Sequence, residues 1–210
     1  MKQVIKKNLA FLVPCLFFLI ASGFFLLLNS KAEAHLILNK YHFKLLDFFF
    51  SYITYLGDFT MAIICSLLLI IHHWRSALFF AISNCLSGGT TQLLKHFVFD
   101  DMVRPKKYFE NMSSLKLVDG VDMNSYNTFP SGHATTAFTI CFCLALLTNN
   151  KPLKFILFLS ALLISYSRVY LSQHFLNDVY AGSLIGITFS LLTYYFFFVW
   201  KKNETRVSKQ

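Results

Sequence analysis

Charged residues are scarce in this 210-residue sequence. They make up 14% of the chain, while hydrophobic residues make up 56%. An ordinary soluble domain carries about a quarter charged residues. A soluble core of this size could not bury repeated apolar blocks of some twenty residues, and a disordered or fibrous chain would not contain them. The scarcity of charge therefore excludes these classes and indicates a protein embedded in a membrane.

The cysteines lack the pattern of a disulfide framework. The five cysteines are odd in number and all lie in apolar stretches. Cys141 and Cys143 are two positions apart, so a helix would turn them to different sides and give no shared metal site. We interpret all five as small core residues: Cys15, Cys65, Cys85, Cys141 and Cys143.

Six stretches are apolar and long enough to cross the hydrocarbon layer of about 30 Å as helices. They run over 10–28, 52–71, 76–94, 133–148, 153–171 and 178–200. Polar residues in the second and third, such as Asp58, Ser87 and Gln92, would be costly in lipid, so we expect both to face protein. Residues 29–51 mix lysines with apolar side chains, which is typical of a helix lying in the interface. The sequence thus predicts an all-α polytopic membrane protein, one domain over 1–210, with six transmembrane helices and an interfacial helix.

The distribution of lysine and arginine predicts the orientation. If both termini are cytoplasmic, ten of the 19 cations and one of the ten anions lie on that side, and nine of each lie on the other. The whole net charge of +9 then sits on the cytoplasmic side, as the positive-inside rule requires. We therefore interpret the basic character as a topology signal rather than nucleic-acid binding. The loop from His96 to Phe129 is predicted to be extracytoplasmic.

A cleaved signal peptide is the competing interpretation of the first apolar stretch. Lys2 to Lys7 precede the stretch, and Ala32-Glu33-Ala34 imitates a small-residue cleavage site. The stretch is nearer twenty residues, whereas the apolar region of a signal peptide has about 7 to 15. Its length favours an uncleaved helix, and either outcome leaves the later orientation unchanged.

Three polar clusters stand at the ends of spans on the predicted extracytoplasmic side. Each has an ordinary explanation alone: a snorkelling cation, a helix N-terminus or a pair on a helix surface. Together they would converge on one pocket at the interface. The clusters are Lys95 with Arg104-Pro105, then Pro130-Ser131-Gly132-His133, then Ser167-Arg168 with His174 and Asp178.

The cations and the helix start provide what a phosphate needs. Lys95, Arg104 and Arg168 offer three positive charges to its oxygens, and arginine can hold two oxygens at once. Ser131 and Gly132 precede a helix whose free N–H groups form an anion cradle, and glycine permits close approach of the backbone. We expect the hydroxyl and the N–H of Ser131 to donate hydrogen bonds to the phosphate.

The two histidines provide a nucleophile and a general acid. His174 and Asp178 are four residues apart, so the carboxylate can accept one ring N–H and leave the other nitrogen free to attack. His133 lies on a different element and can protonate the departing oxygen. Ser131 is the competing nucleophile, with His133 as its conceivable base, but its hydroxyl and N–H are better used as phosphate donors, and His174 already has a carboxylate one turn away. The pattern therefore favours phosphoryl transfer with attack by His174.

These residues resemble the motifs of the type 2 phosphatidic acid phosphatase family, which shares its active-site plan with vanadium haloperoxidases. The second and third motifs match in full, and the resemblance covers roughly Tyr52 to Trp200. The first motif departs from the commonest form, because eight residues separate Lys95 from Arg104 where the family usually has six. The departure bears on Lys95 and leaves Arg104 unaffected.

The resemblance implies a six-helix bundle that removes phosphate from membrane lipids through a phosphohistidine, without a metal or other cofactor. The sequence agrees, since no pair of carboxylates flanks the cluster as a magnesium site would require. The expected partners are the bilayer and a lipid phosphate: undecaprenyl diphosphate, a lipid A phosphate, phosphatidylglycerol phosphate or phosphatidic acid. The expected location is a bacterial inner membrane with an extracytoplasmic site. Alternatives are a lipid phosphotransferase, a non-catalytic phosphate-binding relative and, more remotely, a transporter.

Overall fold

The computed structural model describes residues 2–110 and 115–200, and helices are the only regular elements within those ranges. In chain order they are α1 (Lys2–Lys7), α2 (Leu9–Leu28), α3 (Lys31–Leu38), α4 (Lys44–Ile53), the 3₁₀ helix η1 (Thr54–Gly57), α5 (Phe59–His72), α6 (Trp74–Phe97), α7 (Pro105–Tyr108), α8 (Gly132–Leu147), α9 (Lys151–Tyr170), α10 (Leu176–Tyr194) and the π-helix η2 (Tyr195–Trp200). The all-α prediction is confirmed.

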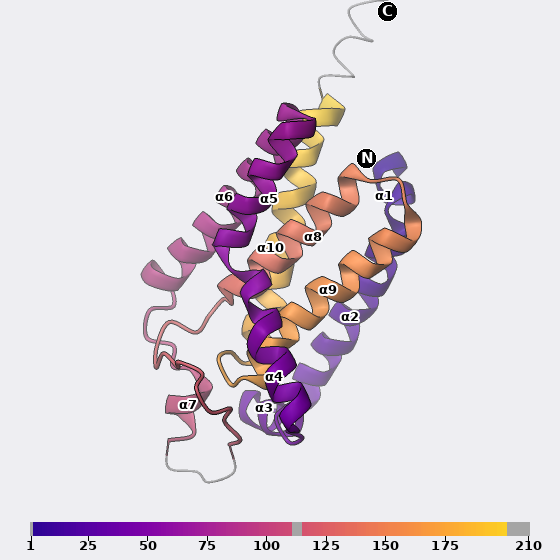
Figure 1. Cartoon of the computed structure of the whole chain (residues 1–210). Helices are drawn as coiled ribbons and strands as arrows, with labels where there is room; N and C mark the ends of the chain where they lie inside the picture. Colours follow the sequence, from indigo (N-terminus) through magenta and orange to yellow (C-terminus); the bar gives the residue numbers. More distant parts are fainter. Residues whose placement is uncertain (1, 111–114, 201–210) are drawn as a thin grey trace, which may run out of the picture.

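The long helices run between two ends of an elongated bundle (Figure 1). One end carries α1 and the C-terminal part of the described chain, and the opposite end carries α3, α4 and α7. The cations expected at 201–209 lie outside the described residues. Lys154 anchors the first of these ends, because its buried ammonium donates to the carbonyl of Lys7 at 2.8 Å and to the side chain of Asn8.

Helix α8 is the centre of the bundle. Twelve of its residues are buried, on every side of the helix, because α6, α9 and α10 all pack against it. Phenylalanines fill the space around it: Phe11 of α2 stacks on Phe142 with ring centroids 4.7 Å apart and meets Phe158 of α9 edge-on. Many of the phenylalanines thus pack in the interior of the bundle.

Two glycines one turn apart bring α10 against α8. A Cβ on Gly182 would lie 2.5 Å from the carbonyl oxygen of Ser131, and one on Gly186 would lie 2.7 Å from that of Thr135. Small residues four apart allow such close approach between membrane helices. The contact sets the start of α8 against the start of α10, where two of the polar motifs lie.

The number of crossings stays a prediction. By length and composition, α2, α9 and the stretch from Leu176 to Trp200 can cross a membrane, and a fourth crossing results if the bent pair before and after Asp58 counts as one. Helix α8 is apolar but shorter, and α6 is long but carries a run of small and polar residues. On α6, Ser87 and Thr91 are buried and bond to threonines of α8, whereas Gln92 is exposed, contrary to expectation.

The expected second span, 52–71, is wrong at its start. Helix α4 ends at Ile53 and is followed by η1. The chain then bends by 57° at Asp58, and α5 begins at Phe59. The expected interfacial helix is two helices rather than one, since α3 ends at Leu38 and α4 begins at Lys44. Ser30 and Glu33 form a capping box that starts α3 there. Helices α3 and α4 lie at the end of the bundle opposite α1 (Figure 1).

Candidate active site

His174 lies in the short turn between α9 and α10 and is almost completely buried. Its Nδ1 is 3.3 Å from Oδ2 of Asp178 and 3.3 Å from the hydroxyl oxygen of Thr128. Burial, followed by the nearby cations Arg104 and Lys95, holds the pKa of His174 well below its usual range. The ring is therefore neutral at neutral pH, and because both contacts involve Nδ1, Nε2 is the nitrogen left to act as a nucleophile.

Thr128 joins this pair although sequence analysis did not select it. Its hydroxyl donates to Oδ2 of Asp178, and the same carboxylate oxygen accepts the backbone N–H of Phe175 at 2.9 Å. Because that hydrogen is given to Asp178, the hydroxyl of Thr128 can act toward His174 only as an acceptor, so Nδ1 of His174 must be the donor. The arrangement fixes the tautomer in which Nδ1 carries the proton.

Helix α3 braces the turn that carries His174. Asn39, directly after α3, donates through its side chain to the carbonyl of Tyr170 at 3.1 Å and to the hydroxyl of Ser172 at 3.0 Å. The Nε2 of His35 lies 3.2 Å from that same hydroxyl, and burial lowers the pKa of His35 to about 4. The turn is therefore held by hydrogen bonds to neutral side chains of α3 and of the residue that follows it.

The start of α8 has the form that the sequence predicted, with one difference. Ser131 is the N-cap residue, and its side chain accepts the N–H of Ala134. The N–H of Ser131 donates to the carbonyl of Asp178 at 3.0 Å, so of its two predicted phosphate donors the hydroxyl is the one that remains available. The N–H groups of Gly132 and His133, in the first turn, have no partner within the helix. No atom lies within 4 Å of the position of a Cβ on Gly132, which leaves room for an anion.

Arg104 is fixed over the His174 turn by backbone and side-chain acceptors. Its Nε donates to the carbonyl of Tyr126 at 3.0 Å, and one terminal nitrogen donates to the side-chain oxygen of Gln173 at 3.0 Å. Gln173 is held in turn by the carbonyl of Asp122 at 2.7 Å. Burial lowers the pKa of Arg104, and the carboxylate of Asp178 opposes that shift. The guanidinium is thus set in place before any ligand arrives.

Lys95 and Arg168 complete the group of cations. Both are buried, with 7% and 8% of their surfaces exposed, and both act electrostatically on His174. Arg168 donates to the hydroxyl of Thr54 at 2.6 Å, while its Nε has no partner among the described residues. Lys95 lies in the last turn of α6 and interacts electrostatically with Arg104, Asp178 and Arg168, so it stays near the cluster despite the longer spacing to Arg104.

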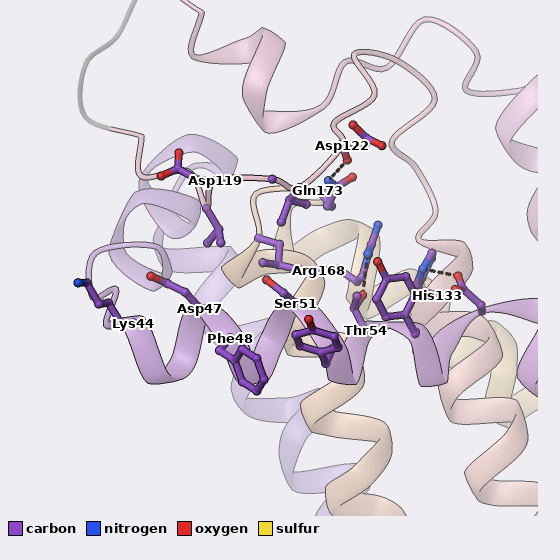
Figure 2. Close-up of a pocket in the computed structure, with 17 residues that line it drawn as sticks. Lys44, Asp47, Phe48, Ser51, Thr54, Asp119, Asp122, His133, Arg168 and Gln173 are labelled. Atoms are coloured by element: carbon purple, nitrogen blue, oxygen red, sulfur yellow. Dashed lines mark hydrogen bonds and ion pairs between the residues drawn. The ribbon is translucent and has the colours of Figure 1, made fainter.

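His133 makes a contact with a carboxylate that sequence analysis did not predict. Its Nε2 lies 2.7 Å from Oδ1 of Asp58, at the bend between η1 and α5. Figure 2 shows His133 beside Arg168 and Thr54 in the wall of a cavity. This cavity has a volume of about 700 Å³, and a second of about 540 Å³ lies between α5 and α6. Both cavities are bordered by His133 and Asp58.

The structure therefore gathers the predicted residues around His174 and adds two that lie outside the motifs. Thr128 and Asp58 reach the site through contacts between distant parts of the chain, and Gln173, directly before His174, holds Arg104. Within the described residues, no three His, Cys, Asp or Glu side chains cluster as metal ligands. The side chains present have the chemistry to bind an anion, to attack it and to exchange a proton with it.

This combination of a helical membrane bundle and an anion site agrees with the family comparison. The model of the PAP2 superfamily matches residues 76–202, and the chain belongs to that superfamily. The match includes all three motifs, so the resemblance drawn from them is confirmed.

Characterised relatives are similar over part of their length. Lipid A 1-phosphatase of Rhizobium johnstonii is 32% identical over 57% of this chain and 47% of its own. Undecaprenyl-diphosphatase of Sulfolobus acidocaldarius is 42% identical over 31% of this chain and 32% of its own. Lipid A 4'-phosphatase of Bacteroides thetaiotaomicron is 27% identical over 54% of this chain and 52% of its own. The chain thus spans about half or less of the relatives it matches.

Two solved structures share the fold. Aquifex aeolicus LpxE is 30% identical, with a TM-score of 0.67 over 76% of this chain and 91% of that one. The transmembrane PAP2-type phosphatidylglycerolphosphate phosphatase of Bacillus subtilis is 20% identical, with a TM-score of 0.60 over 88% of this chain and 94% of that one. These similarities place the chain among integral membrane proteins of the PAP2 fold.

Proposed function

We propose that the protein hydrolyses a phosphate group from a membrane lipid through a phosphohistidine on His174. The observation that carries this proposal is the His174 ring: neutral, oriented by Asp178 and Thr128, and surrounded by buried cations. A neutral imidazole is a nucleophile, and fixed cations stabilise the charge that develops on the phosphoryl oxygens. Neither group alone would indicate this chemistry.

The reaction takes two steps. In the first, the lone pair of His174 Nε2 forms a bond to phosphorus, the bond from phosphorus to the leaving oxygen breaks, and that oxygen takes a proton from His133. In the second, water gives a proton to His133 and attacks phosphorus, and the electron pair of the P–N bond returns to Nε2. Inorganic phosphate leaves, and both histidines recover their first states.

The cavities support a lipid as substrate. The larger one has space for a phosphate-bearing headgroup. The second is bordered by Phe59 and Gly89, on helices that expose apolar side chains, and offers a place for the tail. The names of the relatives put lipid A phosphates and undecaprenyl diphosphate first among the four candidates. The charge distribution favours the extracytoplasmic face of a bacterial inner membrane.

The test is phosphate release by the purified protein in detergent from lipid A, undecaprenyl diphosphate, phosphatidylglycerol phosphate and phosphatidic acid. We expect release from at least one lipid with water as the only acceptor, and none from the His174→Ala variant. With labelled substrate, the trapped phosphoryl group should be stable in alkali and lost in acid, as expected for histidine. No release from any of the four lipids would contradict the proposal, and an acid-stable, alkali-labile group would identify Ser131 as the nucleophile.

A second measurement concerns metal dependence. Because cations and a helix start hold the phosphate, we expect turnover to persist in excess EDTA and to be inhibited by vanadate, which imitates the trigonal-bipyramidal transition state. Loss of turnover with EDTA that magnesium restores would contradict this mechanism.

A further inference from the structure

We propose that Asp58 is the positioning residue of the general acid: its carboxylate binds the Nε2 proton of His133, so that the ring donates through Nδ1. The inference rests on the proposed function, which assigns the general acid to His133. It comes from the contact of 2.7 Å between the Asp58 carboxylate and His133 Nε2. Asp58 lies 75 positions before His133 in the numbering and outside all three motifs.

Helix capping does not account for Asp58. The residue is the N-cap of α5, where an aspartate commonly accepts an N–H of the first turn. Its side chain makes no such bond, and its backbone alone starts the helix. The carboxylate instead contacts His133, on a different helix. The Asp58 side chain therefore contacts His133 instead of capping α5.

The backbone around Asp58 is built to fit against His133. A Cβ on Gly57 would lie 2.8 Å from a methyl group of Ile164 and 3.2 Å from the carbonyl oxygen of His133. Glycine is therefore required for this approach, and the 57° bend directs the next residue toward the ring. The bend between η1 and α5 thus holds Asp58 close to His133 at the start of α8.

Charge explains why the acid needs a carboxylate. Burial of the His133 ring opposes the protonated form that a general acid must have, and the positive charges of Arg168 and Arg104 oppose it further. Asp178 is shared between Thr128, Phe175 and His174. Asp58 bonds to His133 directly and favours its protonated form.

The proton movement follows from this geometry. Protonated His133 keeps Nε2–H on Asp58 and gives its Nδ1 proton to the leaving oxygen as the P–O bond breaks, which leaves His133 neutral. When water attacks the phosphohistidine, its proton returns to Nδ1. Asp58 stays ionised throughout and stabilises the imidazolium form in each cycle.

The test uses Asp58→Asn and two substrates that differ in their leaving groups. A lipid phosphate has a poor alkoxide leaving group that needs the proton, whereas an aryl phosphate such as p-nitrophenyl phosphate leaves with little protonation. We expect phosphoenzyme formation to fall about a hundredfold with the lipid and less than about threefold with the aryl phosphate. Asp58→Glu should recover part of the rate with the lipid. Asp101→Asn, an exposed change of the same charge, serves as the control.

The outcomes separate this inference from the proposed function. If Asp58→Asn slows phosphoenzyme formation equally with both substrates, Asp58 acts only on the structure. If it does not slow the reaction of the lipid, His133 needs no partner. Either result overturns the inference. In both cases wild-type protein still forms the acid-labile phosphoenzyme. If wild-type protein forms none, the proposed function itself fails, and the role of Asp58 fails with it.

Discussion

At the scale of single residues, the site is a set of buried polar groups whose hydrogen bonds are assigned before a ligand arrives. His174 offers one free nitrogen because Thr128 and Asp178 take the other. Arg104 keeps its position because Gln173 and the carbonyl of Tyr126 accept from it. Fixed dipoles and charges need no rearrangement during reaction, which is the main electrostatic advantage of a preorganised site.

Thr128→Val tests the hydroxyl that shares Asp178 with His174. Valine has the same shape, so the variant removes the hydrogen bonds without opening a cavity. A hydrogen bond to a charged group contributes about 1.5–3 kcal/mol, so we expect phosphoenzyme formation about ten- to a hundredfold slower. Thr128→Ser keeps the hydroxyl and should recover most of the rate. An unchanged rate in Thr128→Val would contradict the role of the hydroxyl, and an equal loss in both variants would show that the hydroxyl alone does not account for the effect.

Lys95→Ala tests the first motif. Lys95 is buried beside Arg104 and Arg168 despite the unusual spacing, so we expect a loss of more than tenfold in kcat/KM, or more than about 1.4 kcal/mol of transition-state stabilisation. Lys106→Ala removes an exposed cation nearby and should leave the rate unchanged. A loss at Lys95 below about tenfold would exclude it from the phosphate site.

At the scale of elements, the sequence predicted the helices that consist of apolar runs and missed the breaks between them. Ser131, selected from the sequence, caps α8, whereas Asn150, which was not selected, caps α9, which begins two residues before the expected start at 153. The bend at Asp58 was missed because the run from 52 to 71 is apolar on both sides of it. Thr128 and Asp58 were missed as site residues because their partners lie 50 and 75 positions away, and no local pattern records such contacts.

Gly182→Ala tests the contact between α10 and α8. An added methyl group would meet the carbonyl of Ser131 and should push the two helix starts apart. Overpacking costs about 1–3 kcal/mol, and the midpoint of thermal unfolding should fall by about 2–4 °C for each kcal/mol. Phosphate release should fall as well, because Ser131 belongs to the site.

Gly23→Ala is the matched control for that variant. Its added methyl group would meet the Tyr180 side chain at 3.5 Å, an ordinary contact, and alanine favours the helix. Both the unfolding midpoint and the activity should therefore stay the same or rise. A similar fall in the two variants would mean that glycine matters for flexibility rather than for close approach.

At the scale of the whole molecule, the motifs gather at one end of the bundle and the described termini lie at the other (Figure 1). That arrangement requires an even number of crossings. The six apolar runs and the separation of charge agree with it, although α6 and α8 are less clear as spans by composition alone. Helix α8 is apolar and buried but short for a span, whereas α6 is long enough but places small and polar residues such as Ser87 and Thr91 against α8.

The orientation is tested with single cysteines in a background that lacks the five native ones. Asn124→Cys lies in the exposed loop before α8, and Asn149→Cys lies in the exposed turn between α8 and α9, at opposite ends of one helix. The positive-inside rule predicts that an impermeant thiol reagent labels position 124 in whole cells and position 149 only after lysis. Because one helix separates the two sites, each serves as the control for the other. The reverse pattern would place the site in the cytoplasm, and labelling of both in whole cells would show that α8 does not cross the membrane.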